Sequence, residues 1–172
     1  MLKQEFILLI PGIIYGVAIV DLLKLFRTRM YPELWGWGVF AFLSIIQSWL
    51  SLFNKLDKIA TNNLDFLVIV IHSVMMAKAI SLLTPEEEDI DSERYFLSII
   101  KPFAKLVTAI ILLNFIIQYT VYDDNTALWW RLTAIGWSLW LVFTQKRWVR
   151  YFILTIFLVF SLYRLLAEQI NF

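Results

Sequence analysis

The sequence of 172 residues contains no cysteine and a single histidine, His72. The lack of cysteine excludes disulfides, iron–sulfur clusters, thiolate zinc sites and a cysteine nucleophile. A single histidine also excludes haem or metal ligation by two histidines of the same chain. Charged residues are scarce, at 17% of the chain, against about 25% in soluble domains. The 15 basic and 14 acidic side chains almost cancel, so no net field favours nucleic acid as a partner.

Motifs typical of soluble enzymes are missing as well. The sequence has no GxGxxG, no GxxxxGK[ST], no HExxH and no GxSxG. An intramembrane enzyme or redox carrier would need a catalytic pair or axial ligands, and one histidine without cysteine supplies neither readily. We therefore expect no enzymatic activity, no metal and no cofactor.

Hydrophobic residues are what the chain has in excess, at 60% of the total. A soluble domain of this size leaves roughly a third of its unfolded area exposed, so it could not hide that much apolar surface. A hydrocarbon core about 30 Å thick is crossed by roughly 20 apolar residues as helix. Six stretches approach that length: 6–26, 34–53, 64–83, 103–121, 127–144 and 148–167. The predicted fold is all-α, a single integral membrane domain of six spans with short loops. The lipid bilayer is therefore an expected partner of this domain.

The longest segment between spans, 84–102, has its own predicted structure. Ser92 to Lys101 has apolar residues on one side, which predicts a short amphipathic helix at the membrane surface that ends at Pro102. The acidic residues before it form either a solvated loop or a contact for a cation or a basic partner. These docking candidates are Glu86, Glu87, Glu88, Asp89 and Asp91.

The basic residues predict an orientation. With six spans, ten of the 15 basic residues fall in or near the links after spans one, three and five, and five fall on the other side. Because basic residues favour the cytoplasmic side, both termini are predicted to be non-cytoplasmic. The fifth span is the weakest part of this topology, since it is the shortest and contains Arg131.

Polar residues inside the predicted spans are candidates for a function, because burying them in lipid costs free energy. The candidates for a transport or ion path are Asp21, Gln47, His72, Lys78 and Asn114. Each also has a structural interpretation: Asp21 could pair with Lys24 or Lys78 near the interface, and His72 could be neutral and hydrogen-bonded to a neighbouring helix. The amides of Gln47 and Asn114 could hold helices together.

Two further patterns concern helix packing. Gln47 continues a polar stripe of serines along span two, formed by Ser44, Ser48 and Ser51, which suits a hydrophilic path or helix adhesion. Gly12 and Gly16 form a GxxxG face, which lets another helix approach closely.

Two function classes follow from these features. The first is an oligomeric channel or transporter with a polar path built from the few intramembrane polar residues. The second is a non-catalytic membrane anchor, a subunit of a larger complex or a signal-responsive effector, which would dock through the acidic segment. Either would be an integral protein of a membrane, and the many small bacterial inner-membrane proteins of this kind make that membrane the expected one.

Overall fold

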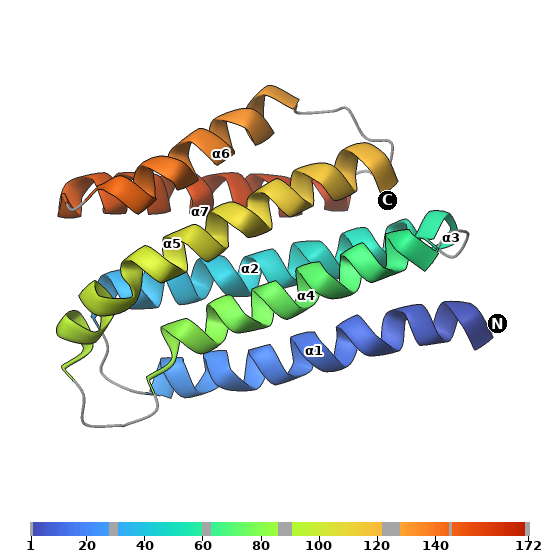
Figure 1. The fold of residues 1–172 in the computed structure, drawn as a ribbon, viewed down its shortest axis with the longest axis horizontal. Coiled ribbons are helices and arrows are strands. Elements are labelled where there is room, and N and C mark those ends of the chain that lie inside the picture. Colours follow the sequence, from blue (N-terminus) through green and yellow to red (C-terminus); the bar gives the residue numbers. More distant parts are fainter. Residues whose placement is uncertain are drawn as a thin grey trace.

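A computed structural model describes residues 2–27, 31–59, 63–85, 91–121, 128–144 and 146–170. Within these ranges the chain is an all-α bundle of antiparallel helices, which confirms the predicted fold class (Figure 1). The elements are α1 (Leu2–Arg27), α2 (Pro32–Asn54), the single turn α3 (Leu56–Ile59), α4 (Asn63–Leu83), α5 (Ser92–Ile116), the π-helix η1 (Ile117–Val121), α6 (Leu128–Phe143) and α7 (Arg147–Ile170).

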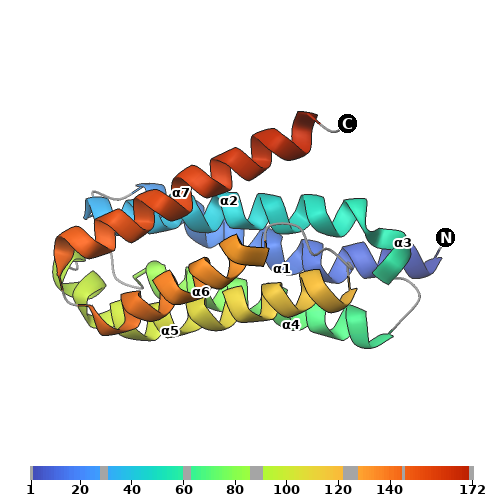
Figure 2. The ribbon, with the colours of Figure 1, turned by 90° about the horizontal axis from the view of Figure 1, so that it is seen from above.

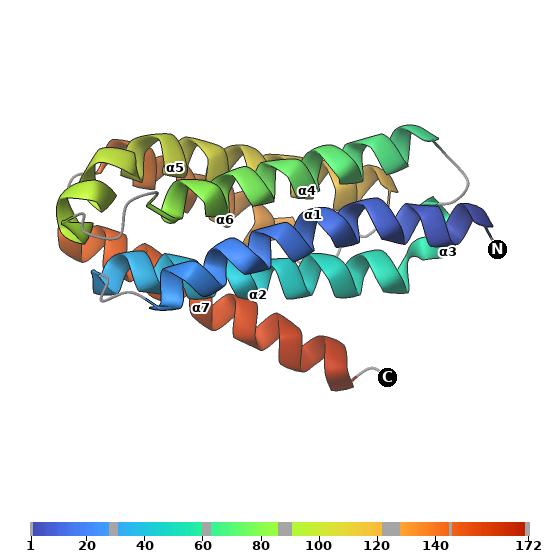
Figure 3. The same cartoon turned by 90° about the horizontal axis from the view of Figure 1, so that it is seen from below.

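The bundle has two distinct ends, because successive long helices run in opposite directions (Figures 1 and 3). At one end, α2, α5 and α7 begin; we call it the closed end. At the other end, α1, α4 and α6 begin and α7 finishes; we call it the cleft end. The first and last helices therefore have their outer ends on the same side of the bundle. Near the cleft end, α7 leaves the other helices at an angle (Figure 2).

Five helices are long and apolar enough to cross a membrane: α1, α2, α4, α5 with η1, and α7. The chain is therefore an integral membrane protein. A helix also forms at the predicted fifth span, but α6 has only 16 residues. That length rises about 24 Å, which is short of a hydrocarbon core about 30 Å thick. A full crossing by α6 stays a prediction.

One side of α1 shows what surrounds the bundle. Phe6, Leu9, Ile13, Val17 and Val20 recur every three or four residues and are each 54–59% exposed. Such spacing places all five side chains on one outward face of the helix. An exposed apolar stripe of this length is costly in water and favourable against acyl chains. This face of α1 therefore suits contact with lipid.

The segment before the fourth span differs from its prediction. Asp91 is the N-cap of α5, since its carboxylate accepts from the N–H groups of Glu93 and Arg94 at 3.1 and 3.3 Å. From there α5 continues through Pro102 to Ile116 without a break. The predicted end of a separate surface helix at Pro102 is therefore wrong. Its apolar side, with Phe96, is buried in the bundle and does not rest on a membrane surface.

Two groups of buried apolar side chains hold the bundle together. The larger occupies the closed half and includes Trp37, Phe96 and Phe103, none of which is more than 1% exposed. The smaller lies near the cleft end and includes Ile59 of α3 and Ile117 of η1. Between these two groups the interior is not completely filled by apolar side chains, and the candidate site lies there.

Candidate functional site

A cleft of about 160 Å³ lies inside the bundle and is only partly enclosed. It runs from the middle of the molecule toward the cleft end, and all six long helices contribute to its wall. An engineered cavity of about 150 Å³ is large enough to hold benzene. The cleft therefore has room for a solute of about that size.

The stripe predicted on span two forms one wall of the cleft. Ser44, Gln47, Ser48 and Ser51 of α2 all line it. The Ser44 hydroxyl donates to the Phe40 carbonyl oxygen at 2.8 Å, so part of the stripe is satisfied within its own helix. The side-chain N–H of Gln47 donates across to the carbonyl oxygen of Ser161 on α7 at 2.6 Å. Gln47 thus lines the cleft and also joins two helices. Its part in a transport path stays a prediction.

His72 and Asn114 reach the same cleft from two other helices. His72 lies on α4 and is only 5% exposed. Asn114 lies on the last turn of α5, and Gln118 follows it on η1. Short π-helical segments of this kind occur frequently at functional sites. The structure therefore brings together three of the five predicted path candidates, Gln47, His72 and Asn114.

Toward the cleft end the wall carries two arginines that the sequence had not singled out as site residues. Arg131 of α6 and Arg164 of α7 both line the cleft and are half-buried. The rings of Trp130 and Phe160, beside them in sequence, stack with centroids 3.9 Å apart and an interplanar angle of 27°. This stack holds the start of α6 against α7. The signal that could have found Arg131 was its position inside a predicted span.

Aromatic rings close the cleft toward the other end. Phe40, Phe103 and Phe157 line its inner limit. Behind them lies Trp37, which is fully buried, with its ring centroid 5.4 Å from that of Phe103 and 6.2 Å from that of Phe157. Edge-on and stacked contacts of this kind stabilise an aromatic cluster beyond simple burial. The four rings form a floor between the cleft and the closed end.

Beyond this floor lies a buried ion pair, which sequence reasoning missed. Arg150 of α7 donates to both carboxylate oxygens of Glu33 on α2, at 2.7 Å from Nε and 3.0 Å from Nη2. Glu33 is 0% exposed and Arg150 3%. Bidentate arginine–carboxylate pairs of this kind are among the strongest ionic contacts in proteins. We call this pair the clasp; it joins the starts of α2 and α7.

Tyr31, just before α2, completes the clasp region. Its backbone N–H donates to Ser92 Oγ at 3.0 Å, and the Arg147 guanidinium lies 5.2 Å from the centre of its ring. Burial, with a smaller contribution from the Glu33 carboxylate, raises the pKa of the Tyr31 phenol above its ordinary value. The phenol is therefore neutral at physiological pH. Contacts of Tyr31 with Ser92 and Arg147 thus tie α5 and α7 to the start of α2.

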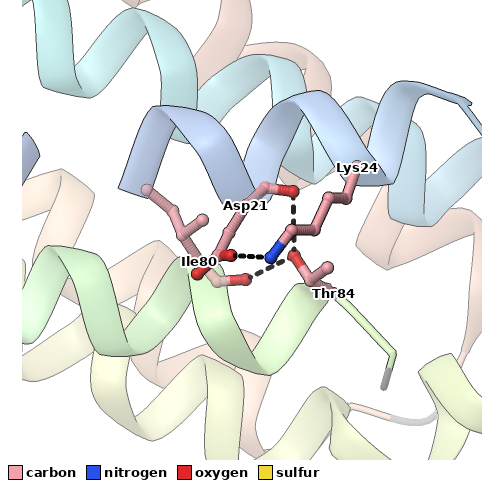
Figure 4. A network of polar contacts seen from close by, with 4 residues as sticks. All are labelled: Asp21, Lys24, Ile80 and Thr84. Atoms are coloured by element: carbon pink, nitrogen blue, oxygen red, sulfur yellow. Dashed lines mark hydrogen bonds and ion pairs between the residues drawn. The ribbon is translucent and has the colours of Figure 1, made fainter. Parts of the chain in front are cut away.

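The other two predicted path candidates lie away from the cleft. Asp21 pairs with Lys24 one turn further along α1, at 2.9 Å, and both side chains remain partly in contact with solvent (Figure 4). The Thr84 hydroxyl lies 3.2 Å from the Ile80 carbonyl oxygen and 3.4 Å from that of Asp21, which links α4 to α1. Lys78 is exposed on α4, and no ion pair joins it to Asp21 within the described residues.

The glycine pair on α1 divides between two environments. A Cβ atom at Gly12 would lie 3.0 Å from Cη2 of Trp49 on α2, so a glycine suits this contact. A Cβ atom at Gly16 would meet nothing within 4 Å, because this position faces outward. Only Gly12 is therefore in close contact with another helix of the same chain.

The acidic docking candidates are mostly beyond what the structure describes. Glu86, Glu87, Glu88 and Asp89 lie outside the described residues. Asp91 is exposed and is used as the N-cap of α5. Its role in docking stays a prediction.

Comparisons with known proteins leave the cleft as the main basis for a function. No protein-family model, no curated protein and no solved structure matches the chain.

Proposed function

We propose that this integral membrane protein is a transporter or channel for a small polar solute, and that the cleft is its solute site. The observation that carries the proposal is a partly open cleft lined by Gln47, His72 and Asn114 inside a bundle of membrane-crossing helices. Polar side chains are costly at membrane depth and commonly mark solute and ion pathways. Bound solute and water would satisfy such groups better than lipid does.

The closed end favours a transporter over a permanently open channel. A channel needs a continuous path, whereas here the aromatic floor and the clasp separate the cleft from the closed end. In alternating access, a central site opens to one side at a time as one part of the bundle rocks against another. The arrangement matches a state open on one side, in which α2 and α7 are held together at the closed end by Arg150 and Glu33.

Orientation and assembly extend the same proposal. The closed end carries most of the basic residues, so by the positive-inside tendency it faces the cytoplasm. The cleft then faces the opposite side of the membrane, together with both termini. We place the protein in a bacterial inner membrane, as a homo-oligomer or as one subunit of a membrane complex, without enzymatic activity and without nucleic acid as a partner.

Solute uptake by reconstituted vesicles tests the proposal, and the chain offers a matched pair of variants on one helix. Ala134 of α6 lines the cleft, whereas a Cβ atom at Gly136, two residues away, would meet nothing within 4 Å. Ala134→Leu should fill the cleft, and Gly136→Leu should add the same side chain to an open outer position. Uptake of small solutes is followed by light scattering as the vesicles swell.

We expect faster swelling with the wild-type protein than with empty vesicles. That difference should be lost in Ala134→Leu and kept in Gly136→Leu, with the thermal stability of each variant measured alongside. Wild-type vesicles that swell no faster than empty ones for any solute or gradient would overturn the proposal. Equal uptake by both variants would overturn the assignment of the cleft.

A further inference from the structure

The lining of the cleft changes from apolar to polar in the same direction on three helices. Because α2, α5 and α7 all begin at the closed end, a higher residue number on each of them lies nearer the cleft end (Figure 1). The first lining residue on each helix is a phenylalanine: Phe40, Phe103 and Phe157. The polar lining residues of these helices all come later: Ser44, Gln47, Ser48 and Ser51 of α2, Asn114 and Gln118 of α5, and Ser161 and Arg164 of α7. On these helices the inner part of the cleft thus offers aromatic surface, and the outer part offers polar groups.

The inner part of the cleft is a closely packed apolar surface. The rings of Phe40 and Phe157 stack with centroids 5.3 Å apart and an interplanar angle of 29°. Trp37 packs edge-on against Phe40 and Phe103 from behind. Val107, one turn after Phe103, extends the surface with an aliphatic side chain. Side chains of this kind favour burial of the apolar part of a ligand.

Beyond this surface the cleft presents amides and hydroxyls. Gln47 and Ser48 lie two turns after Phe40, so Gln47 is about 10 Å further along the axis of α2. Asn114 faces the same volume from the last turn of α5. An amide carries two N–H donors and a carbonyl acceptor, and a hydroxyl also donates and accepts. A ligand group that does both, such as another amide or a hydroxyl, therefore matches this part of the wall.

We infer that the cleft binds a small amphipathic molecule, whose apolar part is the size of a benzene ring and whose polar part is an amide or a hydroxyl. The apolar part lies against the rings of Phe40 and Phe157. The polar part lies among Gln47, Ser48 and Asn114. The volume of about 160 Å³ suits this ligand, because a cavity of about 150 Å³ holds benzene and the open side leaves room for the substituent. The inference rests on the proposed function, because it names the class of solute that the same cleft would carry.

Stabilisation by added ligand tests the inference with three probes. Thermal unfolding of the protein in nanodiscs of zwitterionic lipid is measured at rising concentrations of benzamide, acetamide and toluene. Benzamide has both the ring and the amide, acetamide has only the amide, and toluene has only the ring. We expect benzamide to raise the melting temperature, because a ligand that binds the folded state stabilises it. Acetamide should need at least about tenfold higher concentrations for the same shift, since it buries no ring.

Variants of the cleft wall locate the two parts of the ligand. Asn114→Leu should weaken benzamide binding about fivefold, through loss of a hydrogen bond, and should not weaken toluene binding, because toluene makes none. Asn54 is exposed at the end of α2 and is not among the residues that line the cleft, so Asn54→Leu is the matched control and should leave both responses unchanged. Ala134→Leu should abolish both responses, and Gly136→Leu should retain them.

Several results would overturn the inference: acetamide as effective as benzamide, equal effects of Asn114→Leu on benzamide and toluene, or a benzamide response that persists in Ala134→Leu. Stabilisation by decane and not by benzamide would assign the cleft to a lipid chain and overturn the inference too.

The swelling assay separates this inference from the transport proposal. Benzamide binding that depends on the cleft, without uptake of any solute, would support the ligand class and reject transport. Uptake that is lost in Ala134→Leu, without any response to benzamide, would overturn the inference and leave the transport proposal standing.

Discussion

The two ends of the bundle differ in how they use buried polar side chains. At the closed end, the cation of Arg150 is bound to the anion of Glu33 on a facing helix, and both are almost completely buried. At the cleft end, the uncharged amides of Gln47 and Asn114 line a partly open volume, together with His72. A buried ion pair closes a helix interface, whereas polar groups around a cleft suit a ligand or water. The same bundle thus uses buried polar groups to close one end and to line a cleft toward the other.

The largest effect on stability is expected from removing one partner of the clasp. Arg150→Leu leaves the Glu33 carboxylate buried without its partner, and such a loss typically costs about 3–5 kcal/mol. We expect this drop in the free energy of unfolding, measured by denaturant titration in mild detergent. The double variant Glu33→Leu/Arg150→Leu removes both charges and should recover most of the loss. A single variant as stable as the wild type would contradict the matched-charge account of the closed end.

A comparable effect is expected from the aromatic floor. Trp37 is fully buried against Phe40, Phe103 and Phe157, so Trp37→Ala should leave a cavity and cost about 3–5 kcal/mol. Trp37→Phe keeps most of the ring contacts and removes an indole N–H with no hydrogen-bond partner among the described residues. We expect it to cost less than about 1.5 kcal/mol. Similar losses in both variants would show that ring packing is not what holds the floor.

A smaller effect is expected where α2 and α7 touch near the closed end. A Cβ atom at Gly36 would lie 2.5 Å from Cδ2 of Leu154, so Gly36→Leu should overpack this interface by about 1–3 kcal/mol. Gly16→Leu places the same side chain in open space on α1 and should leave the melting temperature almost unchanged. Thermal unfolding of the two variants, side by side, checks the difference. Equal shifts would mean that α2 and α7 are not in close contact there.

The smallest effect on stability is expected at the Asp21–Lys24 pair, which is partly exposed, whereas the clasp is buried. The Lys24 side chain is 63% exposed and that of Asp21 27%. Pairs in contact with solvent contribute about 0–1 kcal/mol, because water screens them. Asp21→Asn should therefore change the free energy of unfolding by less than about 1 kcal/mol. A loss as large as that of Arg150→Leu would contradict the ranking of matched charge by burial.

The sequence predicts the helices well, because runs such as 64–83 leave few alternatives once lipid is the solvent. Intramembrane polarity also identifies Gln47, His72 and Asn114, which meet in the cleft. Sequence polarity does not distinguish these three residues from Asp21, because a polar residue within a span does not reveal which side of its helix faces the interior.

Other features depend on distance in three dimensions. Glu33 and Arg150 are 117 residues apart, and each by itself is a charge near the end of a span. Pro102 indicates a helix boundary locally, yet burial of Phe96 in the bundle core keeps α5 continuous across it. Tertiary packing decides both outcomes.

With this arrangement, water should reach the cleft and should not pass the aromatic floor. The chain has no native cysteine, so single cysteines can be labelled without background. Ser48→Cys in the cleft, Ala104→Cys in the closed half and Val17→Cys on the outer face of α1 should be treated with a membrane-impermeant thiol reagent in oriented vesicles. We predict rapid labelling of Ser48→Cys from the cleft end only, with Ala104→Cys and Val17→Cys unreactive. If Ser48→Cys were as unreactive as Ala104→Cys, water would not reach the cleft, and the proposed solute site would be wrong.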